Sequence, residues 1–173
     1  MLHPYNLEIF RDRLKENHLS SQAKTFHQAT GRFSIECYKA DMEYAFRTPG
    51  FGGFQLLDLQ DYPGQGSALV GILDAFMDSK GIVAPETFYG FCAPLVPLAL
   101  MKDHCWLNTQ PLHIDVALSN YVEGDWNEPV RWSLASDNGG WKREGQLSAS
   151  VPQGEVGRVG SIELSLSAIK EAR

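Results

Sequence analysis

The sequence predicts an α+β protein in which the last part of an α/β repeat, residues 1–102, precedes an incomplete antiparallel β-sandwich, residues 103–173. Three observations predict this fold class. Apolar residues recur at helical spacing through the first 46 residues, a short apolar run at 54–59 lies between glycines and a turn, and apolar and polar residues alternate after Lys102. The change of periodicity near residue 102 places the boundary between the two parts.

The first part is expected to be helical with one buried strand. An amphipathic pattern begins at Leu7 and continues to Phe26, with a break expected near residues 17–21. The apolar run 54–59 does not alternate, so we expect a strand buried on both faces, as in a parallel sheet covered by helices. The expected elements are helices at 6–26, 33–46, 67–77 and 85–91 and a strand at 54–59. The proline-containing stretch 93–100 is interpreted as a connection leading away from them.

The second part is expected to be antiparallel. Its alternating segments are 112–121, 130–136, 145–151 and 160–166, and residues 136–141 read SDNGGW, which predicts a hairpin turn. These strands are fewer than the roughly seven of the usual sandwich, and the first part has one strand where a complete (β/α)8 barrel needs roughly 250 residues. We therefore expect the chain to be a fragment at both ends.

Composition excludes several classes of function. The net charge is −6 and the 15 Lys and Arg residues are scattered, which does not favour nucleic-acid binding. The longest apolar run, 94–101, is too short for a membrane span and contains two prolines. Glu8 and Asp12 interrupt any signal-peptide pattern, and the three cysteines cannot form a complete disulfide set. The sequence predicts neither a membrane nor a nucleic-acid partner and leaves the compartment open.

A group of polar residues lies where the predicted strand 54–59 becomes a loop. This group contains Asp58, Gln60, Asp61, Tyr62 and Gln65. Ligands bind at this edge of α/β folds, and carboxylates, amides and a phenol suit sugars because hydroxyl groups both donate and accept hydrogen bonds. We expect these residues to bind substrate. The alternative is that Asp58 and Asp61 accept hydrogen bonds from backbone NH groups of the loop.

Other candidate sites have weaker patterns. Gly64 and Gly66 precede the expected helix 67–77 but lack the lysine and third glycine of a phosphate loop, so no cofactor is predicted. Glu36, Asp41 and Glu43 are expected on a solvated helical face. The residue types Cys92, His104, Cys105 and His113 lack metal-ligand spacing, so no metal site is predicted.

Four tryptophans lie in the β-rich part. Trp132 alternates with Leu134 and is expected in the core, whereas Trp126 and Trp141 lie beside turns. An exposed Trp126 or Trp141 on a flat sheet face would indicate the alternative function, a non-catalytic carbohydrate-binding or interaction module.

The sequence also resembles a known enzyme family. The stretch IECYKADMEYAFRTPGFGGFQLLDLQDYPGQGSALVGILDAFMDSKG looks like the closing part of the catalytic barrel in family 2-type glycoside hydrolases of gut Bacteroidetes, commonly labelled β-galactosidases. The resemblance extends back to NLEIFRDRLKENHL and forward through ETFYGFCAPLVPLA to PQGEVGRVGSIELSL.

That resemblance implies a (β/α)8 barrel fragment followed by an incomplete Ig-like sandwich, in an enzyme that cleaves O-glycosidic bonds with retention. It also implies that both catalytic glutamates precede Met1, so no catalytic residue is expected in this chain. Asp58, Gln60, Asp61, Tyr62 and Gln65 then line one wall of the pocket. Retaining hydrolysis needs two carboxyl groups about 5 to 5.5 Å apart, so this chain is expected to be inactive alone. Unpaired sheet edges on both sides of the strand 54–59 are expected to favour association.

Overall fold

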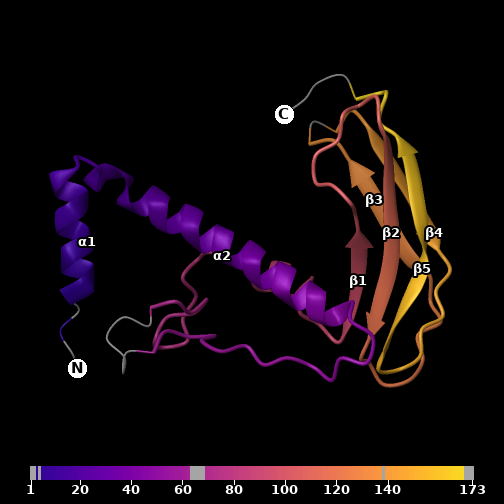
Figure 1. Cartoon of the computed structure of the whole chain (residues 1–173), viewed down its shortest axis with the longest axis horizontal. Coiled ribbons are helices and arrows are strands. Elements are labelled where there is room, and N and C mark those ends of the chain that lie inside the picture. Colours follow the sequence, from indigo (N-terminus) through magenta and orange to yellow (C-terminus); the bar gives the residue numbers. More distant parts are fainter. Residues whose placement is uncertain (1–2, 4, 63–68, 138, 170–173) are drawn as a thin grey trace. The chain divides into compact units, whose positions relative to one another are not determined.

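A computed structural model describes residues 3, 5–62, 69–137 and 139–169 (Figure 1). The chain has mixed α+β content, with helices first and antiparallel sheets after them, as the sequence predicts. It divides into two compact units: unit 1 contains residues 1–42 and 53–90, and unit 2 contains residues 43–52 and 91–173. The described residues form no barrel. None of the helices described combines the length and apolar character that a bilayer span requires.

The first helical region has the predicted break. Helix α1 spans Tyr5–Glu16, the 3-10 helix η1 spans Ser20–Gln22, and helix α2 follows at Ala23–Phe46. His18 between them has a φ of 57°, a left-handed conformation that an α-helix cannot contain.

The prediction of a separate second helix from residue 33 was wrong, because α2 continues through Thr30 and Gly31. The Thr30 hydroxyl donates to the Phe26 carbonyl oxygen at 2.8 Å, so this side chain is satisfied inside the helix. Gly31 has a packing role: a Cβ there would lie 2.6 Å from Cγ2 of Ile82. The glycine therefore allows the segment around Ile82 to pack directly on α2.

The predicted strand 54–59 and helix 67–77 were also wrong wherever the structure describes them. Residues 54–59 contain no strand, and Asp58 has a φ of 63° in a turn. The Leu73 amide donates to the Leu59 carbonyl oxygen and the Asp61 amide donates to the Leu73 carbonyl oxygen, both at 3.0 Å. These backbone groups pair across a loop, so they cannot form helical i→i−4 bonds. Short helix α3 spans Pro85–Tyr89, close to its predicted position.

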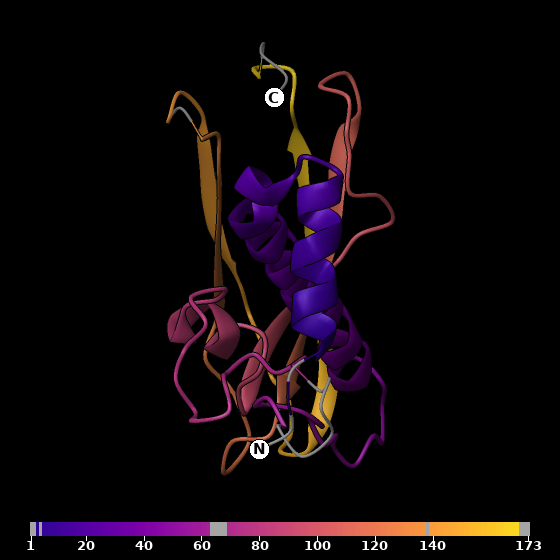
Figure 2. The same ribbon diagram turned by 90° about the vertical axis from the view of Figure 1, so that its left-hand side faces the viewer.

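Unit 2 contains two antiparallel sheets (Figures 1 and 2). The strands are β1 Leu95–Leu100, β2 Pro111–Asn120, β3 Val130–Ala135, β4 Lys142–Leu147 and β5 Glu155–Ser165. The three-stranded sheet has the order β1-β2-β5, and β3 and β4 form a two-stranded hairpin. The predicted hairpin turn is confirmed, because the Ser136 amide donates to the Trp141 carbonyl oxygen at 2.9 Å.

Strand β1 lies in a stretch that the sequence suggested was a connection. Pro97 pairs with Leu118 of β2 and is tolerated because β1 is an edge strand, where a missing backbone NH costs no sheet bond. Contacts within the chain assign β1 to unit 2, which contains residues 43–52 and resumes at residue 91. The domain boundary expected near residue 102 stays a prediction. The strand edges expected at 54–59 are not formed, whereas β1 and β5 each have one unpaired edge within the described residues, so association remains a prediction.

Apolar side chains cover both faces of the three-stranded sheet. On one face, Val96, Leu98 and Ala117 pack with Phe46 of the last helical turn of α2. On the opposite face, side chains of the sheet pack with the β3–β4 hairpin and its loops in two clusters. The buried members of these clusters are Leu112, Trp141 and Leu166 in one and Leu118, Ala149 and Val151 in the other. The core of unit 2 thus lies on both sides of β2.

Candidate functional site

The predicted sugar-binding residues belong to unit 1, and those that the structure describes differ in exposure and in contacts. Asp58 is half-buried in its left-handed turn. Gln60 is exposed and pairs through its backbone with Leu73 in an isolated parallel bridge. Tyr62 is 53% exposed, and Gln65 lies outside the described residues. Of the four described members, Asp58, Gln60 and Tyr62 are thus half-buried or exposed.

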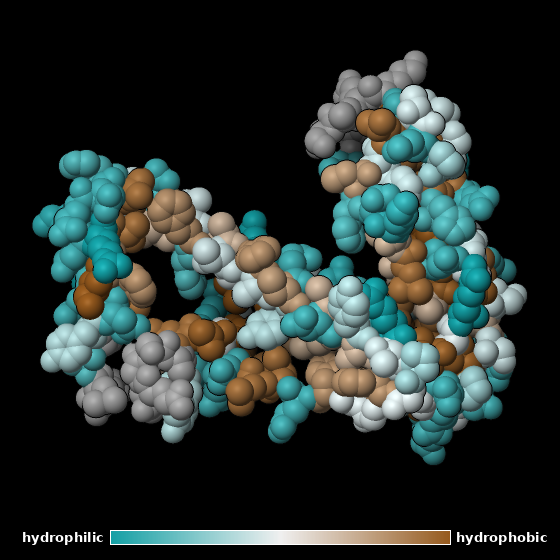
Figure 3. Space-filling view, viewed as in Figure 1, coloured by the Kyte–Doolittle hydropathy of each residue, from teal (hydrophilic) through white to brown (hydrophobic). Residues whose placement is uncertain are grey.

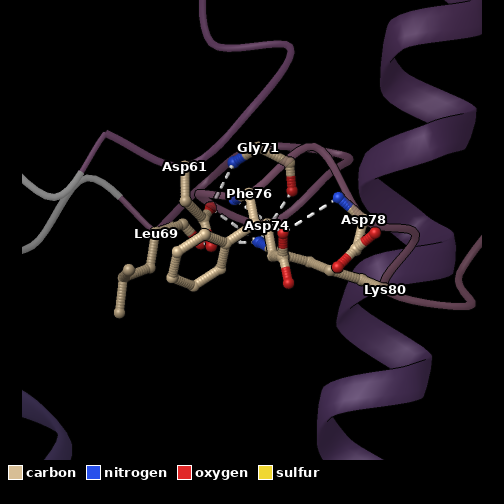
Figure 4. Close-up of polar contacts among 7 residues, drawn as sticks. All are labelled: Asp61, Leu69, Gly71, Asp74, Phe76, Asp78 and Lys80. Carbon is tan, nitrogen blue, oxygen red and sulfur yellow. Dashed lines mark hydrogen bonds and ion pairs between the residues drawn. The ribbon is translucent and has the colours of Figure 1, made fainter.

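Asp61 is the exception, because it is only 6% exposed. Its Oδ1 atom accepts a hydrogen bond from the Gly71 amide at 2.9 Å and lies 2.6 Å from the ammonium nitrogen of Lys80 (Figure 4). Lys80 also donates to the Gly71 carbonyl oxygen at 2.8 Å. Asp61, Gly71 and Lys80 therefore form a closed network, which we call the Asp61 clamp. Asp61 therefore bonds a backbone amide, as in the alternative that the sequence left open, although Gly71 lies beyond the loop 61–66 considered there.

Gly71 is required by the geometry of this clamp. A Cβ at residue 71 would overlap the backbone of Gln60 and Asp61. Because glycine has no side chain, residue 71 can approach residues 60–61 closely enough for its amide to reach the Asp61 carboxylate.

A tight turn brings Lys80 back to the clamp. The Asp74 Oδ1 atom accepts hydrogen bonds from the amides of Phe76 at 2.8 Å and Asp78 at 3.0 Å, and the Asp74 amide donates to the Asp78 carbonyl oxygen at 2.9 Å (Figure 4). Aspartate commonly stabilises turns in this way. The turn reverses the chain, so the lysine side chain can return to Asp61.

A second polar group lies on the three-stranded sheet of unit 2. Asp115 Oδ1 accepts hydrogen bonds from Ser161 Oγ at 2.8 Å and from Arg158 Nη2 at 2.7 Å. The two ring nitrogens of His113 face carboxylates, with Nδ1 at 3.2 Å from Glu163 and Nε2 at 3.5 Å from Asp115. The hydrogen bond from Ser161, then the positive charge and hydrogen bond of Arg158, lower the pKa of Asp115 despite some desolvation.

This polar group borders a depression of about 410 Å³. Its lining includes His113 and Asp115 from β2 and residues from the loop after β1, namely Lys102, Asp103, Trp106 and Gln110. Such a volume lies within the range of small-molecule pockets, roughly 300 to 1,000 Å³.

Sequence reasoning considered His113 only as a metal ligand and missed this arrangement. The available signal was the alternation in the two strands: His113 and Asp115 are two residues apart, as are Ser161 and Glu163. The register pairs His113 with Glu163 and Asp115 with Ser161, which places the four side chains together. The register itself could not be read from the sequence.

Trp126, Trp132 and Trp141 give no exposed platform. Trp141 is 7% exposed within the core, and Trp126 is half-buried with its Nε1 donating to the Glu128 carbonyl oxygen at 2.8 Å. Trp132 is also half-buried and lies against Gly145.

Of the other residues weighed from the sequence, Gly64 and Gly66 lie outside the described residues. Cys37, Cys92 and Cys105 are free thiols, and burial raises the pKa of Cys92. No three His, Cys, Asp or Glu residues of the described chain are grouped to hold a metal ion.

Comparison with known proteins locates a similarity in unit 2. Residues 110–173, which contain β2 to β5, match the model of a family described as a domain of unknown function (DUF8488). A search of curated proteins finds no match to the chain.

Proposed function

We propose that this chain is a non-catalytic part of a retaining glycoside hydrolase of the family 2 type. In this proposal residues 58–65 contribute one wall of the sugar pocket, unit 2 is an accessory Ig-like sandwich domain, and the two catalytic glutamates belong to other segments of the enzyme. The resemblance of the sequence from NLEIF to SIELSL supports the proposal because it covers most of the chain.

The observation that carries the proposal is the position of Asp61 between two exposed polar side chains. Asp61 is held by Lys80 and Gly71, while Gln60 before it and Tyr62 after it are exposed. A clamped backbone limits the entropy lost when such side chains bind a ligand. Gln60 can donate and accept hydrogen bonds, and a tyrosine ring can cover the apolar face of a sugar.

Uncovered apolar side chains in unit 1 also support the proposal. Leu57 is 80% exposed and Phe76 is 81% exposed, and Phe54, Leu59 and Leu69 are exposed as well. Figure 3 shows hydrophobic surface distributed among polar residues. Further barrel segments, as the resemblance implies, would cover side chains of this kind. The alternative module with a tryptophan platform has less support, because Trp126 and Trp141 are not exposed.

The test is a sugar titration of the isotope-labelled full chain followed by NMR, with galactose and lactose as probes. We expect amide signals of residues 58–62 to shift with a dissociation constant of about 1 to 10 mM, because one pocket wall alone makes few contacts. Tyr62→Ala should weaken this binding. Tyr89→Ala, which removes another exposed tyrosine of unit 1, is the matched control.

Two results would contradict the proposal. One is the absence of any shift at residues 58–62 at saturating sugar. The other is measurable hydrolysis of aryl-glycosides by the purified chain, since the proposal places both catalytic glutamates elsewhere.

A further inference from the structure

We propose that the depression between β2 and the loop 101–110 in unit 2 is a binding site for a neutral sugar. This site is distinct from residues 58–65 and lies in the other unit, so it does not depend on the pocket wall proposed above. The proposal rests on an anchored aromatic ring, on polar groups without protein partners among the described residues, and on the balance of charges around the depression.

Trp106 supplies an aromatic surface whose position is fixed. Its side chain packs against the buried cluster of Leu112, Trp141 and Leu166, and it also lines the depression. A half-buried indole of this kind loses little conformational freedom on binding. Its ring can contact the CH groups on one face of a sugar.

Gln110 and Asp115 supply a donor and an acceptor. The Gln110 Oε1 atom accepts a hydrogen bond from the Leu107 amide at 3.0 Å, which orients the side chain and leaves its NH2 group as a donor. The contacts of Asp115 with Arg158, Ser161 and His113 are all made by Oδ1. Within the described chain, Oδ2 of Asp115 has no hydrogen-bond partner and can accept from a sugar hydroxyl.

The Asp115 carboxylate is held ready for this role. Ser161 and Arg158 fix its position and lower its pKa, so it remains an acceptor at neutral pH. Hydrogen bonds to a charged acceptor are stronger than those between neutral groups. A pre-oriented carboxylate therefore contributes to affinity without a cost of rearrangement.

Charge selects a neutral ligand over an anion. Lys102 in the lining and Arg158 beside Asp115 contribute two positive charges. Asp103 and Asp115 in the lining and Glu163 beside His113 contribute three negative charges. An acidic ligand would face this negative excess at close range. A neutral sugar instead finds donors at Lys102 and Gln110 and acceptors at Asp103 and Asp115, which matches the dual character of its hydroxyl groups.

The experiment is an NMR titration of the full chain with glucose, galactose, mannose and N-acetylglucosamine, and with glucuronate as an acidic comparison. We expect at least one neutral sugar to shift the signals of residues 102–115 saturably and to bind more tightly than glucuronate. Asp115→Asn should weaken that binding about tenfold, because it removes a hydrogen bond to a charged group. Trp106→Ala should weaken it about fivefold, and Trp106→Phe should restore part of the loss.

Glu144→Gln is the matched control, because it removes an exposed carboxylate from β4 that does not line this depression. If Asp115→Asn or Trp106→Ala disturbs folding, two other results test the site. One is which signals of the unmodified chain shift with sugar, and the other is the effect of Gln110→Ala, a substitution at an exposed residue. The proposal is overturned if none of the four neutral sugars shifts residues 102–115, if glucuronate binds more tightly, or if Gln110→Ala and Glu144→Gln have equal effects. Shifts at residues 58–62 report on the other site separately.

Discussion

The ammonium nitrogen of Lys80 lies 2.6 Å from Oδ1 of Asp61, and both side chains are largely removed from solvent. The pair joins the loop predicted to follow the strand 54–59 to the segment that follows the predicted helix 67–77. The ion pair holds the Asp61 side chain inside unit 1, whereas the side chains of Gln60 and Tyr62 are exposed to solvent.

Lys80→Met is expected to destabilise unit 1 by about 3 to 5 kcal/mol, because it leaves the Asp61 carboxylate buried without a counter-charge. Hydrogen exchange at the amides of Asp61 and Gly71 would measure the loss of protection. The exposed Lys39 of α2 provides the control Lys39→Met. The double variant Asp61→Leu/Lys80→Met should be more stable than Lys80→Met alone; equal or lower stability would contradict an ion-pair role.

Gly71→Ala should open the same clamp through steric overlap. The added Cβ would meet the backbone of Gln60 and Asp61, and a cost of about 1 to 3 kcal/mol is typical of overpacking. Gly52→Ala is the matched control, since no heavy atom beyond its chain neighbours lies within 4 Å of its Cβ position. Chemical denaturation would compare the two, and an equal loss of stability in both would count against the clamp geometry.

Asn120 and Ser119 are both fully buried but should respond in opposite ways to alanine. Asn120 donates to the carbonyl oxygens of Gly124 at 3.1 Å and Val151 at 3.0 Å and accepts from the Val122 amide at 3.1 Å. Asn120→Ala removes three hydrogen bonds and leaves the Gly124 carbonyl oxygen and the Val122 amide without this partner, which should cost about 3 kcal/mol. The Ser119 hydroxyl has no partner among the described residues, so Ser119→Ala should be neutral or stabilising. Thermal melting of both variants checks this contrast.

Asp115 should titrate below the ordinary range of aspartate, mainly because Ser161 donates to it. A carboxyl pKa that is lower in the folded state stabilises the fold above the unfolded pKa, and this contribution disappears as the pH falls through the folded pKa. Carboxyl-carbon NMR would follow the titration, and Ser161→Ala should raise the pKa of Asp115. Glu144 is the internal control, because its pKa is lowered by Lys142 and should not respond.

Most of unit 2 could be predicted because its strands and its hairpin turn follow from patterns among neighbouring residues. Alternation in 112–121 and 130–136 identified β2 and β3, and the SDNGGW turn identified the hairpin that β3 forms with the next strand, β4. Strand β1 was missed because two prolines in 94–97 argue against a strand. Pro97 is acceptable because β1 is an edge strand, and β1 becomes an edge strand only by pairing with β2.

Unit 1 was predicted less well. The helical spacing located α1, the break after it and the second half of α2, but the interruption expected between residues 26 and 33 is helical. The apolar run 54–59 was assigned to a strand, which requires neighbouring strands to form. Without such neighbours among the described residues, Leu59 and Asp61 pair with Leu73 instead. An apolar run indicates that a segment is buried, but it does not indicate which other segment packs against it.

The sequence by itself determined the α+β order, the helical first part, the antiparallel second part and the polar character of residues 58–65, because periodicity and turn residues act over short distances. Tertiary structure decided which polar residues are available. It brought Lys80 to Asp61 across a loop, and it aligned β2 with β5 so that Asp115 meets Ser161 and Arg158. Contacts between residues far apart in the chain depend on loop closure and strand register, and neither is encoded in a local pattern.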